Sequence, residues 1–387
     1  MSQVARVFRA LIGLIAALML LGCATLQTGT PSGPDPSDVF ASRQIIALLP
    51  DATNVAQMRD VTGSAGYEEL DVTGLSGLGL TMMTYRMPDG VTGAQAIAEL
   101  EAAVPTSTVG INHAYRLQQQ SAEQALNYAD AMMGWTEGGC RARVPIGMID
   151  TAIDETSPAL AGAQVITKKF FDGPAADATH GTDVAAVLAD PGRLQGVKLY
   201  SANVFGQPEA ADLVAGADAL VRALDWFAQE DVRLVNLALA GPYNKLLNLA
   251  VERAAARGLI LVAAVGNDGP TVDPLYPAGF KEVIAVTAVD LNSRIYRNAV
   301  RGPHVDVAAP GVDVLIPTAG RARFVTGTSI ATPFVAARLA ADPSIVGARD
   351  VAEVRDRLAR TSAELGPAGH DPMFGYGLAL ANDVCGE

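Results

Sequence analysis

Short apolar runs alternate with longer amphipathic segments through most of the C-terminal part of the chain. The runs are rich in small and branched residues, as is typical of strands buried on both faces of a sheet. They lie at residues 144–150, 163–170, 198–205, 232–240, 259–266 and 281–290. Segments 211–230 and 244–258 have apolar residues at helical spacing. The alternation predicts an α/β fold, a mostly parallel sheet with helices on both faces.

A different pattern comes earlier, between residues 41 and 118. Strand-like runs at 43–50, twice within 67–88 and at 108–117 are interrupted by helical segments at 54–66 and 92–104. The order β-α-β-β-α-β predicts a small ferredoxin-like α+β domain. A further helix is predicted at 119–134, at the start of a larger domain that would extend to residue 387.

The first 22 residues are typical of an export signal. Two arginines precede an apolar run at 11–21, which is short for a membrane span. The run ends at Gly22 and Cys23 in a pattern that resembles the bacterial lipobox, in which the cysteine carries lipid. An ordinary signal peptide or anchor helix with an incidental Cys23 is the alternative. Residues 23–40, rich in Thr, Ser, Pro and Gly, predict a flexible tether.

The net charge of the chain argues against two classes of binding partner. A formal net charge of −13 argues against nucleic acid and leaves no polybasic patch for a membrane surface. Contact with a membrane would therefore go through a lipid on Cys23. The expected location is the bacterial cell envelope, and the outer membrane is favoured because Ala24 is not an acidic retention signal.

Two further cysteines, Cys140 and Cys385, lie in the larger domain. In an exported protein they permit one disulfide, which would tie the start of this domain to its end. Two unpaired thiols are the alternative, because sequence separation says nothing of distance in space.

Three short motifs carry the candidate chemistry. Asp150 ends the apolar run 144–150, His180 stands in THGTDVAAVLA, and Ser329 stands in GTSIATPFVAA. Taken singly, Asp150 could be a helix cap and His180 a cap or surface residue, and an isolated GTS would be weak evidence. Their order along the chain, Asp, His, Ser, is that of one of the known serine-hydrolase triads.

With these motifs the chain resembles the subtilisin-like (subtilase) serine peptidases over roughly residues 119–380. The resemblance implies that Ser329 is the nucleophile, that His180 acts as base and then acid, and that Asp150 orients His180. It also implies that Asn267, in the A-x-G-N segment, donates its amide to the oxyanion. A plain turn is the alternative for Asn267.

The same resemblance implies a role for the small domain. Subtilases commonly carry such a unit as a propeptide that assists folding and inhibits the enzyme, so residues 41–118 would be its own propeptide partner. Self-cleavage would fall near Leu117 to Ser121. A substrate-binding or spacer domain is the alternative.

The segment LVNLALAGP, residues 234–242, matches the part of the family that pairs with substrate backbone. The substrate-binding residues thus implied, together with another wall of the specificity pocket, are Leu237, Ala238, Leu239, Ala240, Gly241, Ala263, Ala264 and Gly266. The family usually has Ser and Gly where this chain has Ala238 and Ala240. The small apolar lining favours medium-sized hydrophobic side chains in substrates, while the extra methyl group of Ala240 puts the pocket depth in doubt.

Two other departures from the family lie beside the triad. Ala152 stands where the family usually has Gly, which alters the turn after Asp150. Ile330 stands where it usually has an oxidisable Met, so we expect activity that tolerates mild peroxide.

No HExxH, CxxC pair or EF-hand loop is present in the sequence. We therefore expect no metal site and no cofactor in catalysis; structural calcium, frequent in the family, has no convincing ligand set here. The expected partners are polypeptide substrates. A catalytically silent subtilase-fold lipoprotein that binds or senses is the alternative, and an esterase with the same triad is a third possibility.

Overall fold

The computed structural model describes residues 40–41, 43–117, 120–121, 128–136, 138–206, 214–317, 322–382 and 384–385. The predicted export signal, Cys23 and nearly all of the predicted tether lie outside these residues. Within the described ranges, no helix is long and apolar enough to cross a membrane.

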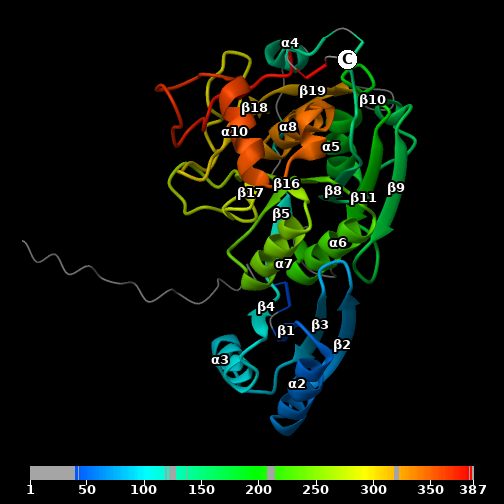
Figure 1. Cartoon of the computed structure of the whole chain (residues 1–387), viewed down its shortest axis with the longest axis vertical. Helices are drawn as coiled ribbons and strands as arrows, with labels where there is room; N and C mark the ends of the chain where they lie inside the picture. The colour runs from blue at the N-terminus through cyan, green and yellow to red at the C-terminus, as the bar shows by residue number, and fades with distance from the viewer. Residues whose placement is uncertain are drawn as a thin grey trace, which may run out of the picture. The chain divides into compact units, whose positions relative to one another are not determined.

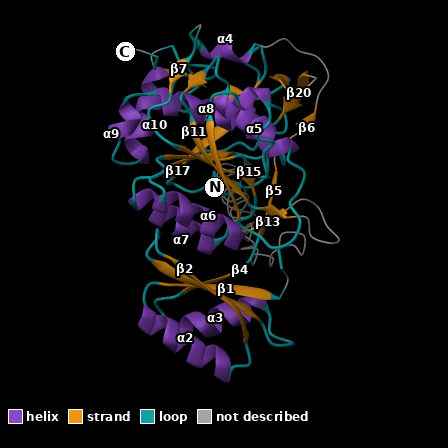
Figure 2. Ribbon diagram, turned by 90° about the vertical axis from the view of Figure 1, so that its right-hand side faces the viewer, coloured by secondary structure: helices purple, strands orange, loops and turns teal. Residues whose placement is uncertain are grey.

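The N-terminal α+β domain is present. Its antiparallel sheet has the order β2-β3-β1-β4 and is formed by β1 (Gln44–Leu49), β2 (Glu68–Leu75), β3 (Leu80–Arg86) and β4 (Thr108–Ile111). Helices α2 (Ala52–Ser64) and α3 (Gly93–Ala103) cover one face (Figure 2). Helix α3 begins at Thr92, whose hydroxyl accepts from the Gln95 amide while the Gln95 side chain accepts from Thr92. This capping box explains why the helix begins there.

Strand β1 is buried on both faces, which explains its unbroken apolar sequence. Ile45 and Leu49 pack in the small core with α2 and α3. Ile46 and Leu48, which point the other way, belong to the main hydrophobic core of the molecule. The small sheet therefore lies between its own helices and the catalytic part of the chain.

The large sheet has nine strands in the order β21-β22-β18-β17-β16-β14-β8-β11-β9. Every pairing from β9 to β22 is parallel. The strands are β8 (Ile146–Asp150), β9 (Gln164–Lys169), β11 (Lys198–Asn203), β14 (Leu234–Leu237), β16 (Ile260–Ala264), β17 (Val283–Val289), β18 (Val307–Pro310), β21 (Ser362–Ala363) and β22 (Leu378–Ala379).

Two pairs of helices cover the large sheet (Figure 1). Helices α5 (Thr179–Ala189) and α8 (Thr328–Ala341) pack together on one face, and α6 (Ala217–Gln229) and α7 (Lys245–Ala256) pack together on the other. Helices α9 (Ser344–Gly347) and α10 (Val351–Thr361) follow near the end of the chain. The predicted α/β architecture is confirmed.

Two predicted helices differ from the structure. The helix expected at 119–134 is wrong at its start, because Gln120–Ser121 form strand β6; of the described residues in this range, Ala129–Met133 are helical (α4). Residues 122–127 lie outside the described residues. The helix expected at 211–230 begins later, at Ala217, because Val214–Gly216 form strand β13. In both cases pairing with a distant strand overrides the local helical pattern.

The structure joins Cys140, in β7 (Cys140–Arg141), to Cys385 in a disulfide. Their Cα atoms are 4.9 Å apart, although 245 residues separate them in sequence. Closing so long a loop removes unfolded-state entropy worth on the order of 5 kcal/mol in the chain-entropy model.

Candidate active site

Asp150 and His180 meet at the carboxyl edge of the large sheet. The Nδ1 atom of His180 lies 2.7 Å from Oδ1 of Asp150, and the two residues are only 5% and 0% exposed. Because a carboxylate only accepts, Nδ1 must carry the proton, which leaves Nε2 as the basic nitrogen. The backbone N–H of Thr151 donates to the same Asp150 oxygen at 2.7 Å. The pair can therefore hold His180 in one tautomer and orientation.

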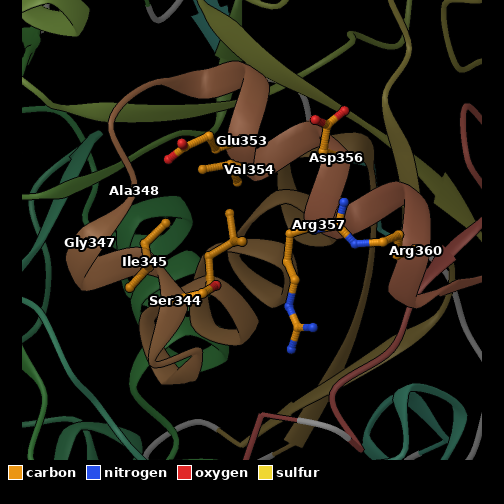
Figure 3. Close-up of a pocket in the computed structure, with 10 residues that line it drawn as sticks. Ser344, Ile345, Gly347, Ala348, Glu353, Val354, Asp356, Arg357 and Arg360 are labelled. Atoms are coloured by element: carbon orange, nitrogen blue, oxygen red, sulfur yellow. The ribbon is translucent and has the colours of Figure 1, made fainter.

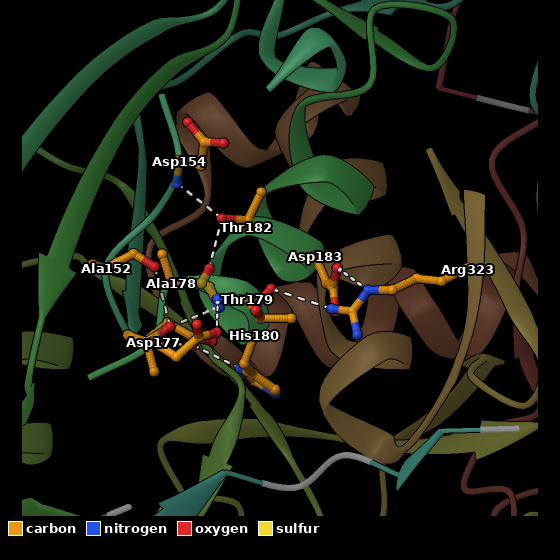
Figure 4. Close-up of polar contacts among 12 residues, drawn as sticks. Ala152, Asp154, Asp177, Ala178, Thr179, His180, Thr182, Asp183 and Arg323 are labelled. Atoms are coloured by element: carbon orange, nitrogen blue, oxygen red, sulfur yellow. Dashed lines mark hydrogen bonds and ion pairs between the residues drawn. The ribbon is translucent and has the colours of Figure 1, made fainter. Parts of the chain in front are cut away.

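The residues beside His180 hold the start of α5 against the turn that follows Asp150 (Figure 4). A Cβ at Gly181 would lie 2.5 Å from the carbonyl oxygen of Ala152, so only glycine fits there. Thr182 accepts from the backbone N–H of Asp154 at 2.8 Å and donates to the carbonyl of Ala178. These contacts fasten the turn after Asp150 to the first turn of α5. The extra methyl group of Ala152 does not prevent this approach.

Asp177 lies three residues before His180 at the start of α5. Hydrogen bonds from the side chain and from the backbone N–H of Thr179 both lower the pKa of Asp177. The Thr179 nitrogen lies 2.8 Å from Oδ1 of Asp177. A carboxylate at this end of a helix is also favoured by the helix dipole.

Ser329 is the second residue of α8 and is fully buried. Gly327 caps the helix in an extended conformation, and its N–H donates to the carbonyl of Gly311 at 2.8 Å. Pro333 lies inside the helix. Because proline has no N–H, the carbonyl of Ser329 receives no helical hydrogen bond from this position. Helix α8 packs against α5, which carries His180.

Asn267 lies in the loop after β16 and is bound to the residue before Ser329. Its Oδ1 atom accepts from the backbone N–H of Thr328 at 3.1 Å and from the Thr328 hydroxyl at 3.0 Å. That hydroxyl in turn accepts from the N–H of Gly266 at 3.2 Å. The amide oxygen of Asn267 thus faces Thr328, and its nitrogen lies on the opposite side of the amide group. These hydrogen bonds fix the side chain of Asn267 in relation to α8.

A segment of the chain itself lies along the predicted substrate strand. Strand β5 (Ala114–Leu117) runs antiparallel between β13 (Val214–Gly216) and β15 (Leu239–Ala240). Leu117 is opposite Leu239, and Arg116 is opposite Ala240. This is the main-chain pairing that was predicted for a substrate at residues 234–242.

The chain makes a second strand contact immediately afterwards. Strand β6 (Gln120–Ser121) runs antiparallel to β20 (Ala322–Thr326), with Gln120 opposite Thr326. Thr326 is three residues before Ser329. Residue 117 is thus paired with the predicted substrate-binding segment, and residue 120 with the strand that leads to Ser329. Residues 118 and 119 lie outside the described part of the chain.

A family model described as the subtilase family matches residues 142–377, which is more than half of the chain. The chain belongs to the subtilase family. It is therefore a serine-type peptidase of the subtilisin kind. The match includes all three motif residues and Asn267.

Named relatives agree with this assignment. This subtilase is 29% identical to subtilisin E of Bacillus subtilis over 307 residues, 74% of this chain and 77% of the relative. It is 32% identical to subtilisin DY of Bacillus licheniformis over 258 residues, 62% of this chain and 89% of the relative. It is 31% identical to the minor extracellular protease Epr of Bacillus subtilis over 262 residues, 63% of this chain but only 39% of that longer relative.

The fold is similar to that in a solved structure, the crystal structure of fervidolysin from Fervidobacterium pennivorans, a keratinolytic enzyme related to subtilisin. The TM-score is 0.74 at 21% identity, over 90% of this chain and 61% of the other. This likeness concerns the fold alone.

The predicted pocket residues of this subtilase lie together. A Cβ built on Gly266 would be 3.5 Å from the side chain of Ala240, so the two predicted walls face each other closely. Gly241 exchanges backbone hydrogen bonds of 2.9 and 2.8 Å with Tyr276. A Cβ at Gly241 would meet the ring of Tyr115 at 2.6 Å. Four other predicted pocket residues are fully buried: Leu237 at the end of β14, Ala238 after it, and Ala263 and Ala264 in β16.

The fully buried Tyr115 occupies a place that sequence reasoning missed. Burial, and then the neighbouring Tyr243, raise the pKa of Tyr115 well above its ordinary value. The Tyr115 hydroxyl donates to the carbonyl of Pro242 at 3.4 Å. The local sequence predicted only a strand there, and no short-range signal marks the distant glycine that makes room for the ring.

A separate cavity of about 430 Å³ lies between α9 and α10 (Figure 3). Its polar lining includes Ser344, Glu353 and Arg357, and no triad member is among the lining residues. Arg357 is bound within the protein, since it donates to the buried Asp342 at 3.2 Å. The cavity is not part of the catalytic arrangement.

Proposed function

We propose that this subtilase is an exported, lipid-anchored endopeptidase that cleaves its own chain between Leu117 and Gln120. The observation that carries the proposal is the pairing of β5 with β15 and of β6 with β20. A protease substrate lies extended through the active site, with main-chain pairing on both sides of the bond that is cut. The two undescribed residues between these strands are where the cut would fall, within the predicted segment Leu117 to Ser121.

The proposed chemistry uses the residues described above. Ser329 Oγ attacks the peptide carbonyl carbon while its proton passes to Nε2 of His180, and Asp150 stabilises the resulting imidazolium. The Asn267 side-chain amide and the Ser329 backbone N–H donate to the oxyanion. His180 then protonates the leaving amine, and water hydrolyses the acyl-enzyme by the reverse sequence. Every step uses protein groups, so catalysis is proposed to need no metal or cofactor.

The N-terminal domain is proposed to remain bound as an inhibitor after the cut. Several polar contacts join it to α6 and α7 in addition to the β5 pairing, and three of them involve carboxylates of the two domains. Glu101 binds Lys245 at 2.6 Å, Asn112 donates to Asp218 at 2.9 Å, and the N–H of Leu78 donates to Asp225 at 2.9 Å. The apolar face of the small sheet adds buried area.

Export is proposed from the N-terminal sequence and is supported by the extracellular relative Epr. The lipid on Cys23 would stay with the N-terminal fragment, because Cys140 and Cys385 both lie after the cut. The catalytic fragment would then remain at the membrane, with the outer membrane favoured, only while it binds its propeptide. A mature catalytic fragment that still carries lipid would refute this arrangement.

The test is intact mass and N-terminal sequencing of the wild type and of Ser329→Ala, both expressed with export and lipidation intact. We expect a wild-type cut between residues 117 and 120 that Ser329→Ala lacks, while Ser344→Ala, a serine in the cavity of Figure 3, is cut normally. Cys23→Ser should abolish incorporation of labelled palmitate. An uncut wild type that still hydrolyses peptides would remove self-processing from the proposal. A wild type whose Ser329 does not react with a fluorophosphonate would instead favour the catalytically silent alternative.

A further inference from the structure

An ion pair outside the triad connects the helix of His180 to the strand beside Ser329. Asp183, one turn after His180, is a carboxylate with only 1% of its surface exposed. Nε of Arg323, on β20, donates to one Asp183 oxygen at 3.2 Å, and its Nη2 donates to the other. Nη2 also lies 3.5 Å from the carbonyl oxygen of Thr179. Figure 4 shows the guanidinium pointing at both groups.

The strand that carries Arg323 faces the chain beyond the proposed cut. On one edge β20 pairs with β19 (Val314–Pro317), and on the other with β6. A substrate's residues on the leaving side of the cut would occupy the place of β6. The position of β20 therefore determines how well that half of a substrate is held.

The two ends of the ion pair differ in how firmly they are fixed. Helix α5 is buried along most of its length and packs against α8. Strand β20 is exposed at its first residue and becomes buried only at Val325 and Thr326. A two-pronged guanidinium–carboxylate contact has a defined geometry, so Asp183 acts as the fixed point to which the strand is held.

We propose that Arg323 is a positioning residue for the leaving-group side of the substrate. By binding Asp183 and the Thr179 carbonyl, it holds β20 in the register that pairs with residues after the cut. The inference rests on the proposed function of the same site, in which the cleaved chain pairs with β15 before the cut and with β20 after it. It assigns to Arg323 a role that neither the triad nor the oxyanion residues fulfil.

The test compares two substrates with the same acyl part. One is a peptide nitroanilide, which has no residue beyond the cut; the other is an internally quenched peptide with four residues beyond it. For Arg323→Gln we expect the ratio of the two kcat/KM values, extended over short, to fall about tenfold, mostly through KM. Arg323→Lys should restore part of it, because a single ammonium keeps the charge but not the fork.

Arg355→Gln is the matched control. Arg355 likewise donates to a buried carboxylate, Asp306, at 2.8 Å and to two backbone carbonyls, but it lies on α10. Its loss should leave the substrate ratio at the wild-type value. A wild type inactive on both substrates would remove the proposed function itself. An active wild type whose ratio is the same in Arg323→Gln would overturn only the role of Arg323.

A variant that folds poorly can still be read by a measurement independent of enzyme concentration. With a dipeptide amide present, the acyl-enzyme partitions: either water or the added amine attacks the ester carbonyl, and Ser329 leaves with the proton from His180. The amine forms a new peptide bond and must occupy the place of β6. We expect Arg323→Gln to reduce the aminolysis-to-hydrolysis ratio severalfold, and an unchanged ratio would contradict the proposal.

Discussion

Strand β8 of the large sheet and strand β1 of the small one are both interior, buried strands, yet they are covered in different ways. Strand β8 of the catalytic sheet is fully buried between two layers of helices that belong to the same domain. Strand β1 of the N-terminal sheet is almost as buried, but Ile46 and Leu48 are covered by the catalytic part of the chain. The catalytic domain therefore covers both faces of its sheet with its own helices. The N-terminal domain covers one face of its sheet with its own helices, and the catalytic domain covers the other.

The largest expected effect follows from separating the two domains. A fragment of residues 41–117 alone exposes the face of Ile46, Leu48 and Met82 to water, which removes a large share of the burial that stabilises so small a domain. We expect its circular dichroism to show little regular structure until the catalytic fragment is added. Cooperative thermal unfolding of the isolated fragment would show instead that this domain folds without the catalytic domain.

Single substitutions on that face measure how much its burial contributes to binding between the two domains. Leu48→Ala should weaken inhibition by the added N-terminal fragment by roughly 2–4 kcal/mol, about 30- to 1000-fold in Ki, through lost burial and a cavity. Leu70→Ala is the control, because Leu70 is 36% exposed on β2 and should change Ki little. If Leu48→Ala changes Ki as little as Leu70→Ala does, burial of this face contributes no binding energy.

A smaller, pH-dependent effect is expected at Asp225, whose carboxylate accepts a hydrogen bond from the backbone of the turn between β2 and β3. Burial raises the pKa of Asp225, and this outweighs hydrogen bonds from Leu78 and Gln229 and the charge of Arg257. In the free catalytic domain the carboxylate would regain water and its ordinary pKa. Binding therefore takes up protons: affinity is highest below the ordinary pKa and falls as pH rises through the raised one.

The measurement is Ki of the N-terminal fragment between about pH 3.5 and 8, below and above the ordinary carboxyl range. Asp225→Asn should flatten a severalfold decline, whereas Asp218→Asn, at the other polar contact on α6, should keep it. Affinity that rises with pH in the wild type would contradict the assignment.

The smallest effect concerns the catalytic domain alone. Ile330, directly after Ser329, is fully buried and has no sulfur to oxidise. We expect activity to survive mild peroxide, and Ile330→Met, a nearly volume-conserving change, to become sensitive. Activity of the wild type should be followed beside peptide mass mapping; loss of activity with the triad chemically intact would contradict this.

Much of this arrangement could be predicted from the sequence where local pattern carries the information. The run at 43–50 predicted β1, but nothing in it shows that alternate residues enter different cores. The motifs around Asp150, His180 and Ser329 identified candidates because their glycines and threonines are part of the motif, and Gly181 and Thr182 indeed make the local contacts described above.

What could not be predicted depends on residues far apart in the chain. Gln120 and Ser121 are strand rather than helix because β20, some 200 residues later, pairs with them. Arg323 and Asp183 are 140 residues apart, and neither is distinguishable in sequence from an ordinary surface charge. The ring of Tyr115 fits only because Gly241, far away in sequence, has no side chain.

The disulfide between Cys140 and Cys385 has a consequence for the lifetime of the enzyme. A peptidase is exposed to copies of itself, and chain ends that fray are the places where proteolysis usually starts. Here the first and last parts of the catalytic domain are covalently closed into one ring of the chain. Trimming of a tail outside that ring leaves the ring whole, so degradation that starts at a tail meets a covalent closure before it reaches the folded core.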